Sequence, residues 1–195
     1  MSTVRDHTAL VVPVPEVEGV VGALREQYDP YSRSGLPAHV TLMAPFISPD
    51  ALTAKHHQQL RECFARVAPF DFILEHVGAF HFDRHGRDEM QVVYLYPDPC
   101  APFCDLIRSL DQLYDMSPYA GFYDNPTPHL TVAVHESVEG WGATSAELSA
   151  VVTYFAQSTK LPAVCRAVEA WLIRANDSPG SFQRLDTFRF KNTSA

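Results

Sequence analysis

The stretch Pro37-Ala38-His39-Val40-Thr41-Leu42 has a close counterpart 90 residues further on, Thr127-Pro128-His129-Leu130-Thr131-Val132. In each stretch a histidine follows a proline and stands two residues before a threonine, inside an apolar run. Residues i and i+2 of a β-strand project from the same face. Each stretch therefore predicts a strand that presents an imidazole and a hydroxyl side by side, and two such strands could present all four groups to one small anion.

The two stretches occupy matching places in a duplicated pattern of elements. In the first half we expect strands at residues 8–14 and 39–44, helices at 15–27 and from 49 to about 67, a turn-rich loop at 29–37, and a strand pair at 70–82 and 90–96 around a polar turn at 83–89. In the second half we expect helices at residues 99–114 and 143–157, a loop at 117–128, and strands at 129–134, 164–174 and 182–190. Each histidine strand thus follows a strand, a helix and a proline-rich loop.

An internal repeat of this length predicts two lobes related by a pseudo-twofold axis rather than a solenoid. Such an axis would place the histidine strands opposite each other across a central cleft. No low-complexity linker separates the halves, so we expect one bilobal α/β (α+β) domain over residues 1–195, with halves at approximately 8–96 and 97–190.

Composition indicates a soluble globular protein. The 195 residues are 46% hydrophobic and 19% charged, and no segment has the 18 or more apolar residues that a bilayer span needs. No signal-like apolar stretch precedes the first expected strand, so a cytoplasmic location is the default expectation. The four cysteines are scattered, which favours free thiols.

The net charge of −8 bears on the partner. Long nucleic acids are usually held by a basic surface, and this chain has no run of lysine and arginine. The balance favours a small phosphate ester, a nucleotide or only the end of an RNA, and argues against long nucleic acid and membrane partners. We expect a monomer.

Paired imidazoles suit acid–base chemistry at phosphorus. The ordinary pKa of histidine, about 6.5, lies near working pH, so one imidazole can accept a proton from water or a ribose hydroxyl while the other donates one to the departing oxygen. The hydroxyls of Thr41 and Thr131 would hydrogen-bond the non-bridging phosphate oxygens. This chemistry requires neither a metal nor a cofactor, and by symmetry either His39 or His129 could be the acid.

The segments PAHVTLMAPF and TPHLTVAV resemble the paired His-x-Thr motifs of the two-histidine (2H) phosphoesterase superfamily. TALVVPVPEVE, FDFILEHVGAF, VVYLYPDP and YAGFYDNPTPHLTVAV are similar to its bacterial 2′-5′ RNA ligase-like branch, over roughly residues 8–190. The resemblance implies a bilobal domain with two antiparallel sheets lining a cleft and helices outside. It also implies catalytic roles for His39, Thr41, His129 and Thr131.

The resemblance implies activities that include hydrolysis of cyclic nucleotide phosphodiesters, cleavage of 2′-5′ linkages and, in some members, reversible 2′-5′ ligation of RNA ends. We therefore expect a phosphodiesterase. The alternatives are an RNA 2′-5′ ligase and a nucleotide-binding protein without catalysis. The acidic charge weighs against the ligase, and the two intact motifs weigh against an inactive protein.

Three further residues are candidates for substrate binding. Tyr123, just before the second motif, and Phe46, just after the first, could stack on a base, although core packing also explains such aromatic residues. Some relatives have a basic residue shortly after the second motif, where this chain has Val134 and His135. If the strand continues that far, His135 shares the face of His129 and could lie at the rim of the site; otherwise it is an exposed histidine at a strand end. The spacing of the other histidines fits no common metal motif, so we expect no metal.

Overall fold

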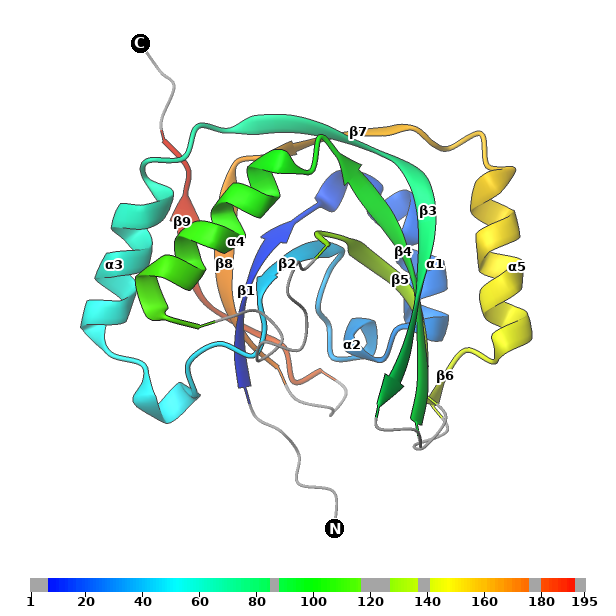
Figure 1. Ribbon diagram of the computed structural model, residues 1–195, viewed down its shortest axis with the longest axis horizontal. Coiled ribbons are helices and arrows are strands. Elements are labelled where there is room, and N and C mark those ends of the chain that lie inside the picture. The colour runs from blue at the N-terminus through cyan, green and yellow to red at the C-terminus, as the bar shows by residue number, and fades with distance from the viewer. Residues whose placement is uncertain (1–6, 85–87, 117–126, 137–140, 176–179, 192–195) are drawn as a thin grey trace.

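The chain forms two antiparallel sheets with helices packed against them (Figure 1). The computed structural model describes residues 7–84, 88–116, 127–136, 141–175 and 180–191. The strands are β1 (His7–Pro13), β2 (His39–Met43), β3 (Phe70–Arg84), β4 (Asp88–Asp98), β5 (Leu130–Glu136), β6 (Trp141–Gly142), β7 (Ala163–Ala167), β8 (Glu169–Ala175) and β9 (Gln183–Arg189). The helices are α1 (Glu18–Tyr28), α2 (Pro30–Arg33), α3 (Ala54–Phe64), α4 (Ala101–Tyr114) and α5 (Ser145–Ala156), with 3₁₀ turns at Pro15–Val17 and Pro49–Ala51. The predicted α/β fold with two antiparallel sheets is confirmed.

The two sheets repeat one pattern of strands, and each of the two repeated units places its last strand in the sheet of the other. Sheet A has the order β2-β1-β8-β9, and sheet B has the order β6-β5-β4-β3-β7. In these orders β1 matches β4, β2 matches β5, and β8 matches β3. The last strand of the first unit, β3, pairs with β4, whereas β8 crosses back to pair with β1. The strand order places β4 between β5 and β3, and the expected halves at 8–96 and 97–190 stay a prediction.

The expected single strand at residues 164–174 is wrong, because this segment passes from one sheet to the other. β7 pairs with β3 in sheet B, and β8 pairs with β1 and β9 in sheet A. Val168 lies between them and is 46% exposed. Buried positions change from odd numbers at Cys165 and Ala167 to even numbers at Ala170 and Leu172. The apolar residues Trp171 and Ile173 conceal this change in the sequence pattern.

The helix expected from residue 49 to about 67 is also divided. A 3₁₀ turn covers Pro49–Ala51, and α3 starts only at Ala54. Thr53 is the N-cap of α3 and forms a capping box with His56, so α3 begins separately from the turn before it.

The expected turn at 83–89 is shorter than predicted, because β3 continues to Arg84 and β4 begins at Asp88. Most of the expected loop at 117–128 lies outside the described residues.

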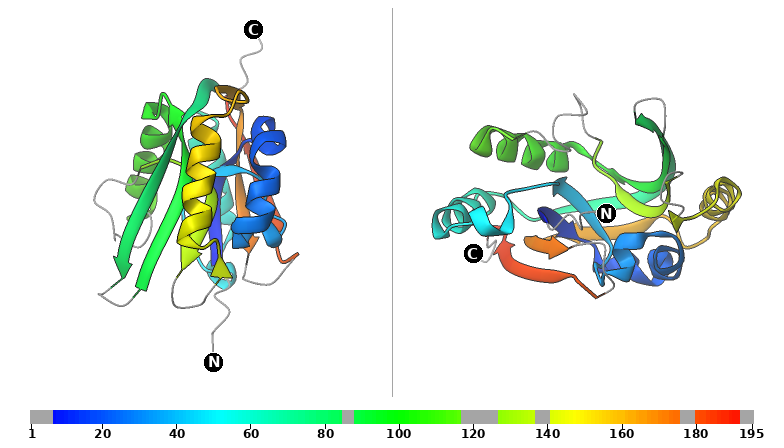
Figure 2. Two further views of the ribbon diagram at one scale, coloured as in Figure 1. Left: turned by 90° about the vertical axis from the view of Figure 1, so that its right-hand side faces the viewer. Right: turned by 90° about the horizontal axis from the view of Figure 1, so that it is seen from below.

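Helix packing crosses between the units. α1 of the first unit lies against β5, and α4 of the second unit lies against β2. α3 and α4 lie on one side of the molecule and α5 with α1 on the other (Figures 1 and 2). One core joins both sheets, with fully buried side chains from β1, β2, β4, β5 and α4. Each histidine strand is therefore held by this core and by a helix of the other unit. None of the described helices is long and apolar enough to cross a membrane.

Candidate active site

The first histidine and threonine lie on β2, at the edge of sheet A. His39 pairs with Pro13 of β1, and Thr41 pairs with Val11. The intervening Val40 is fully buried on the opposite face. The sequence alternation therefore has a direct structural meaning: apolar side chains fix the strand to the core and leave the imidazole and hydroxyl together on the other face.

The second pair repeats this arrangement in sheet B. His129 directly precedes β5, and Thr131 pairs with Tyr94 of β4. Leu130 and Val132 are fully buried in the core. The four predicted catalytic side chains are each part-exposed, and β2 and β5 lie next to each other. The structure thus brings the two predicted pairs to neighbouring strands.

Both strands also bulge at the same place. In β2 the register with β1 shifts between Thr41 and Met43, and in β5 the register with β4 shifts between Thr131 and Ala133. Each bulge therefore follows directly after a threonine. Bulges redirect side chains and are frequent beside active sites. Here they end the part-exposed His-x-Thr face, since both residues that follow each threonine are buried: Leu42 and Met43 in β2, and Val132 and Ala133 in β5.

Each imidazole is oriented by a backbone carbonyl two residues before it. The Nδ1 atom of His39 lies 2.7 Å from the carbonyl oxygen of Pro37, and that of His129 lies 2.7 Å from the carbonyl oxygen of Thr127. A carbonyl can only accept, so Nδ1–H donates in both rings. Both neutral rings then carry an unprotonated Nε2, the atom that can take up or pass on a proton.

Both histidines are part-exposed, and their partial burial favours the neutral form of each imidazole. Desolvation, with further contributions from the charges of Arg25 and His129, lowers the pKa of His39 to about 3. Desolvation also lowers the pKa of His129, against the hydrogen bond to Thr127. Because a charge on His129 acts on His39, the two rings are electrostatically coupled. The charge of Arg25 contributes to the lowered pKa of His39 and is not among the causes of the lowered pKa of His129, so the two rings differ in their electrostatic surroundings.

A buried ionic network lies behind the first motif and was not foreseen from the sequence. Arg25 of α1 and Asp29 are each 1% exposed. The Nε and Nη2 atoms of Arg25 donate to Asp29 Oδ2 at 3.1 and 2.9 Å, and Nη2 also donates to the carbonyl of Leu36 at 3.2 Å. Glu18 accepts a hydrogen bond from the backbone N–H of Ala38. These bonds fix the segment that enters β2, and the spacing of Arg25 and Asp29, i and i+4, is the sequence signal that could have revealed them.

Aromatic rings surround the second histidine. The ring of Phe80 stacks on Tyr94 with centroids 4.2 Å apart, and His129 meets Phe80 edge to face at 5.0 Å and Tyr94 at 5.3 Å. Tyr94 lies over Gly78, where a Cβ atom would overlap its ring. The glycine therefore makes room for the tyrosine, and the tyrosine packs against the catalytic candidate.

Two of the three predicted substrate-binding residues, Phe46 and His135, lie in the described part of the chain. Phe46 is 5% exposed and packs edge to face on Tyr114 at 5.1 Å, so its ring belongs to the core and offers no stacking surface. Tyr123 lies outside the described residues. The bulge after Thr131 places His135 on the opposite face from Thr131, which corrects the expectation that it shares the face of His129. Its Nδ1 atom lies 2.6 Å from the carbonyl oxygen of Ala143.

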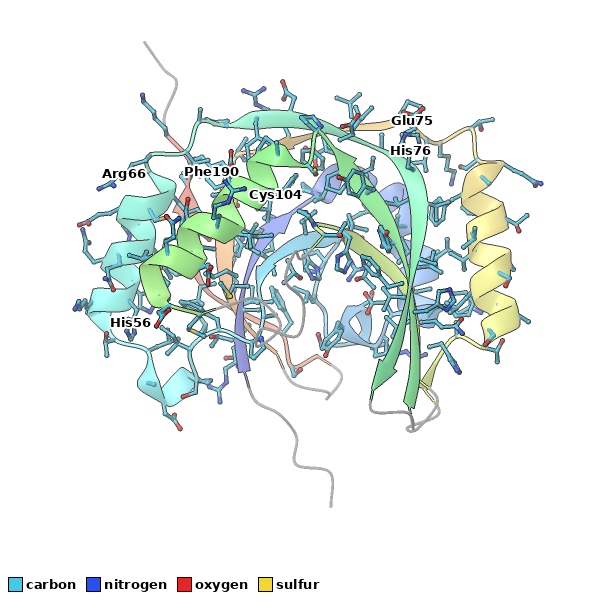
Figure 3. The ribbon with its side chains drawn as sticks, in the orientation of Figure 1. His56, Arg66, Glu75, His76, Cys104 and Phe190 are labelled. Carbon is cyan, nitrogen blue, oxygen red and sulfur yellow. The ribbon has the colours of Figure 1, made fainter. Side chains whose placement is uncertain are left out.

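Other histidines are dispersed. His76 lies with Glu75 on β3, and His56 lies on α3 at the other side of the molecule (Figure 3). His57 is bound to Asp186, with Nδ1 2.7 Å from Oδ2. Among the described residues, no three histidine, cysteine, aspartate or glutamate side chains gather where they could hold a metal ion.

Comparison with known proteins decides the family. The model of the 2′-5′ RNA ligase superfamily matches residues 13–179, which include both His-x-Thr motifs. The chain belongs to the 2′-5′ RNA ligase superfamily. The sequence resemblance to the two-histidine phosphoesterases is thereby confirmed, and the narrower placement in a bacterial branch stays a prediction.

Solved structures show the same fold as this superfamily member. TT0787 of Thermus thermophilus is 16% identical, with a TM-score of 0.53 over 97% of this chain and 100% of that chain. Usb1 of Kluyveromyces marxianus is 13% identical, with a TM-score of 0.53 over 94% and 97%. A protein described as a phosphoesterase is 16% identical, with a TM-score of 0.52 over 96% and 99%. No curated protein matches the chain in sequence.

Proposed function

We propose that this protein is a metal-independent phosphodiesterase that cleaves a cyclic phosphate or a 2′-5′ phosphodiester in a small nucleotide or at an RNA end. The observation that carries the proposal is the matched pair of Nδ1 hydrogen bonds. It leaves two unprotonated Nε2 atoms, each beside a threonine hydroxyl, on neighbouring strands. Membership of the 2′-5′ RNA ligase superfamily supports the substrate class.

The electrostatic difference between the rings suggests their roles. His39, next to the charge of Arg25, stays neutral and serves as the base, and His129 serves as the acid. For a 2′,3′-cyclic phosphate, Nε2 of His39 takes a proton from water as the water oxygen bonds to phosphorus. The bond from phosphorus to one ribose oxygen breaks, and that oxygen receives the proton from Nε2 of His129. Thr41 and Thr131 donate hydrogen bonds to the non-bridging oxygens.

The acid requires a protonated His129 although burial lowers its pKa. A phosphodiester carries a negative charge, and an opposite charge within about 4–6 Å favours the protonated imidazole. Substrate binding would therefore raise the pKa of His129 and supply the proton where it is needed. In the free protein both rings stay neutral, which leaves His39 ready to act as the base.

The proposal is tested by a substrate panel in the presence of EDTA. The panel contains 2′,3′-cyclic mononucleotides, ADP-ribose 1″,2″-cyclic phosphate, cyclic oligonucleotides and 2′-5′ oligoadenylates, with products identified by mass spectrometry. We expect cleavage of at least one class by the wild-type protein and a rate about 100-fold or more lower by His39→Ala. Cleavage at the wild-type rate by His39→Ala and by His129→Ala would refute the proposal.

The two alternative functions predict different experimental results. An RNA 2′-5′ ligase would join tRNA halves that end in a 2′,3′-cyclic phosphate and a 5′-hydroxyl. A non-catalytic nucleotide-binding protein would bind members of the panel tightly without turnover. We further propose that the protein acts as a monomer in the cytoplasm, which size-exclusion chromatography and cell fractionation would test.

A further inference from the structure

The face of sheet A that carries the first motif continues beyond it across all four strands. Thr41 pairs with Val11, Val11 with Trp171 of β8, and Trp171 with Thr187 of β9. Residues paired across an antiparallel sheet project from the same face, and neighbouring strands lie about 4.8 Å apart. Trp171 is therefore about 10 Å and Thr187 about 14 Å from Thr41 along one row of the sheet. Within this row Val11 is 1% exposed and packs with Leu36 and Phe182.

Trp171 holds an arginine in a defined position on this surface. The guanidinium carbon of Arg184 lies 4.6 Å from the centre of the indole ring. The indole Nε1–H donates to Glu169 Oε1 at 2.7 Å, which fixes the orientation of the ring. One face of the guanidinium is therefore occupied by the tryptophan. A planar cation held in this way is a surface on which nucleobases stack.

An arginine-rich groove of about 500 Å³ opens beside this pair, at the end of the row and against α3. Its lining residues are Arg61, Ala65, Glu169, Arg184, Thr187 and Arg189. Arg61 is bound to Asp186 at 2.9 Å, but within the described part of the chain Arg184 and Arg189 form no ion pair. Two unpaired guanidinium groups in a chain of net charge −8 mark a local site for an anion.

We propose that this surface, from Trp171 to the arginine groove, binds the RNA strand adjacent to the reacting phosphate. A base stacks on Arg184, and a backbone phosphate binds between Arg184 and Arg189. A mononucleotide at the histidines does not extend three strands across the sheet, so the groove serves only a longer chain. This inference rests on the proposed function and selects an oligoribonucleotide end over a free cyclic mononucleotide as the preferred substrate.

Steady-state kinetics on two substrates test the inference. One substrate is 2′,3′-cyclic AMP, and the other is a pentaribonucleotide that ends in a 2′,3′-cyclic phosphate. The variant is Arg184→Gln with Arg189→Gln. The control, Arg108→Gln with Arg166→Gln, removes two exposed arginines that are paired to Asp105 and Asp71 and so changes the net charge equally.

We expect the Arg184/Arg189 variant to lower kcat/KM for the pentamer about 10-fold or more, mainly through KM, because stacking and phosphate contacts each contribute at this level. Its kcat/KM for 2′,3′-cyclic AMP should stay within about twofold of wild type. Equal losses on both substrates, no loss on the pentamer, or the same loss in the control would overturn the inference.

A binding measurement tests the RNA-binding surface independently of the proposed catalytic activity. Fluorescence anisotropy with a labelled pentaribonucleotide that ends in an unreactive 3′-phosphate needs no turnover. Binding by wild type that weakens in the Arg184/Arg189 variant and not in the control supports the RNA surface even if no substrate is cleaved. Binding that is equal in all three proteins refutes it, whatever the catalytic result.

Discussion

Replacement of Arg25 by methionine tests the buried network behind the first motif. The variant keeps a side chain of similar length but removes the ion pair with Asp29 and the hydrogen bond to the carbonyl of Leu36. Both partners of the pair are 1% exposed, so Asp29 would be left as an uncompensated buried charge. Breaking one side of a buried pair costs about 3–5 kcal/mol of unfolding free energy. Urea unfolding at pH 7 measures this loss.

The double variant Arg25→Met/Asp29→Asn separates the charge effect from the anchoring effect. Asparagine keeps an oxygen that accepts from the backbone N–H of Tyr31, as Asp29 does now at 3.1 Å, and it removes the buried charge. The double variant should therefore recover much of the stability and lie about 1–3 kcal/mol below wild type, because the bonds made by a charged donor are still lost. A double variant no more stable than the single one would refute the reasoning.

The same pair of variants has a catalytic consequence. The charge of Arg25 contributes to the lowered pKa of His39, so its removal should raise that pKa. If His39 is the base, activity is lost as pH falls through its pKa, and the acidic limb of the kcat/KM profile should move to higher pH in the double variant. An unmoved limb would show that Arg25 has no electrostatic effect on the base.

Two further predictions concern stability. Gly78→Ala should reduce the unfolding free energy by about 1–3 kcal/mol, because the new methyl group overlaps the ring of Tyr94, which Phe80 holds in place. The control Gly19→Ala, in open space on α1, should be neutral or stabilising by about 0.5–1 kcal/mol. Equal effects of the two variants in thermal or urea unfolding would contradict the packing argument. The pKa of His39 is about 3 in the folded protein and 6.5 in the unfolded chain, so between pH 3 and 6.5 only the unfolded chain binds a proton at this imidazole. The contribution of His39 to the unfolding free energy should therefore be fully present above pH 6.5 and decrease as the pH falls toward 3. The slope, measured by urea unfolding, should be shallower in His39→Asn, and an unchanged slope would show that the pKa of His39 is not lowered in the folded protein.

Much of the site could be predicted from the sequence because it depends on local rules. The i, i+2 alternation of β-strands places His39 beside Thr41 and His129 beside Thr131 without any tertiary information. The near-repetition of two segments then suggests that the pairs meet. The fold class followed from the resemblance, whose motifs lie in the segments that form β2 and β5.

The rest depends on non-local pairing that no single segment specifies. The transfer of residues 164–174 between two sheets is set by the partners β3 and β1, and both halves of the segment are apolar enough for one strand. The bulge after Thr131 reverses the face of His135, and it is visible only in the register with β4. Arg25 is a helical charge that composition alone would place in solvent, and its burial depends on Asp29 and Leu36.

The aromatic candidates show the same limit. Phe46 and the rings that border His129 are all aromatic residues near a motif in sequence or in space. Only the fold distinguishes Phe46, which packs in the core on Tyr114, from Phe80 and Tyr94, which contact His129. Phe46 was a candidate only because it lies near a motif in the sequence, whereas strand pairing brings Phe80 and Tyr94 to His129.

The central claim is that His39 and His129 act as base and acid on one phosphate, and the pH dependence of kcat/KM tests it most directly. The profile of the wild-type protein should be bell-shaped with its maximum on the acidic side of neutrality, because burial lowers both pKa values. The residual activity of His39→Ala should lose the acidic limb, and that of His129→Ala should lose the alkaline limb. Persistence of both limbs in either variant, or wild-type activity in either, would contradict the account.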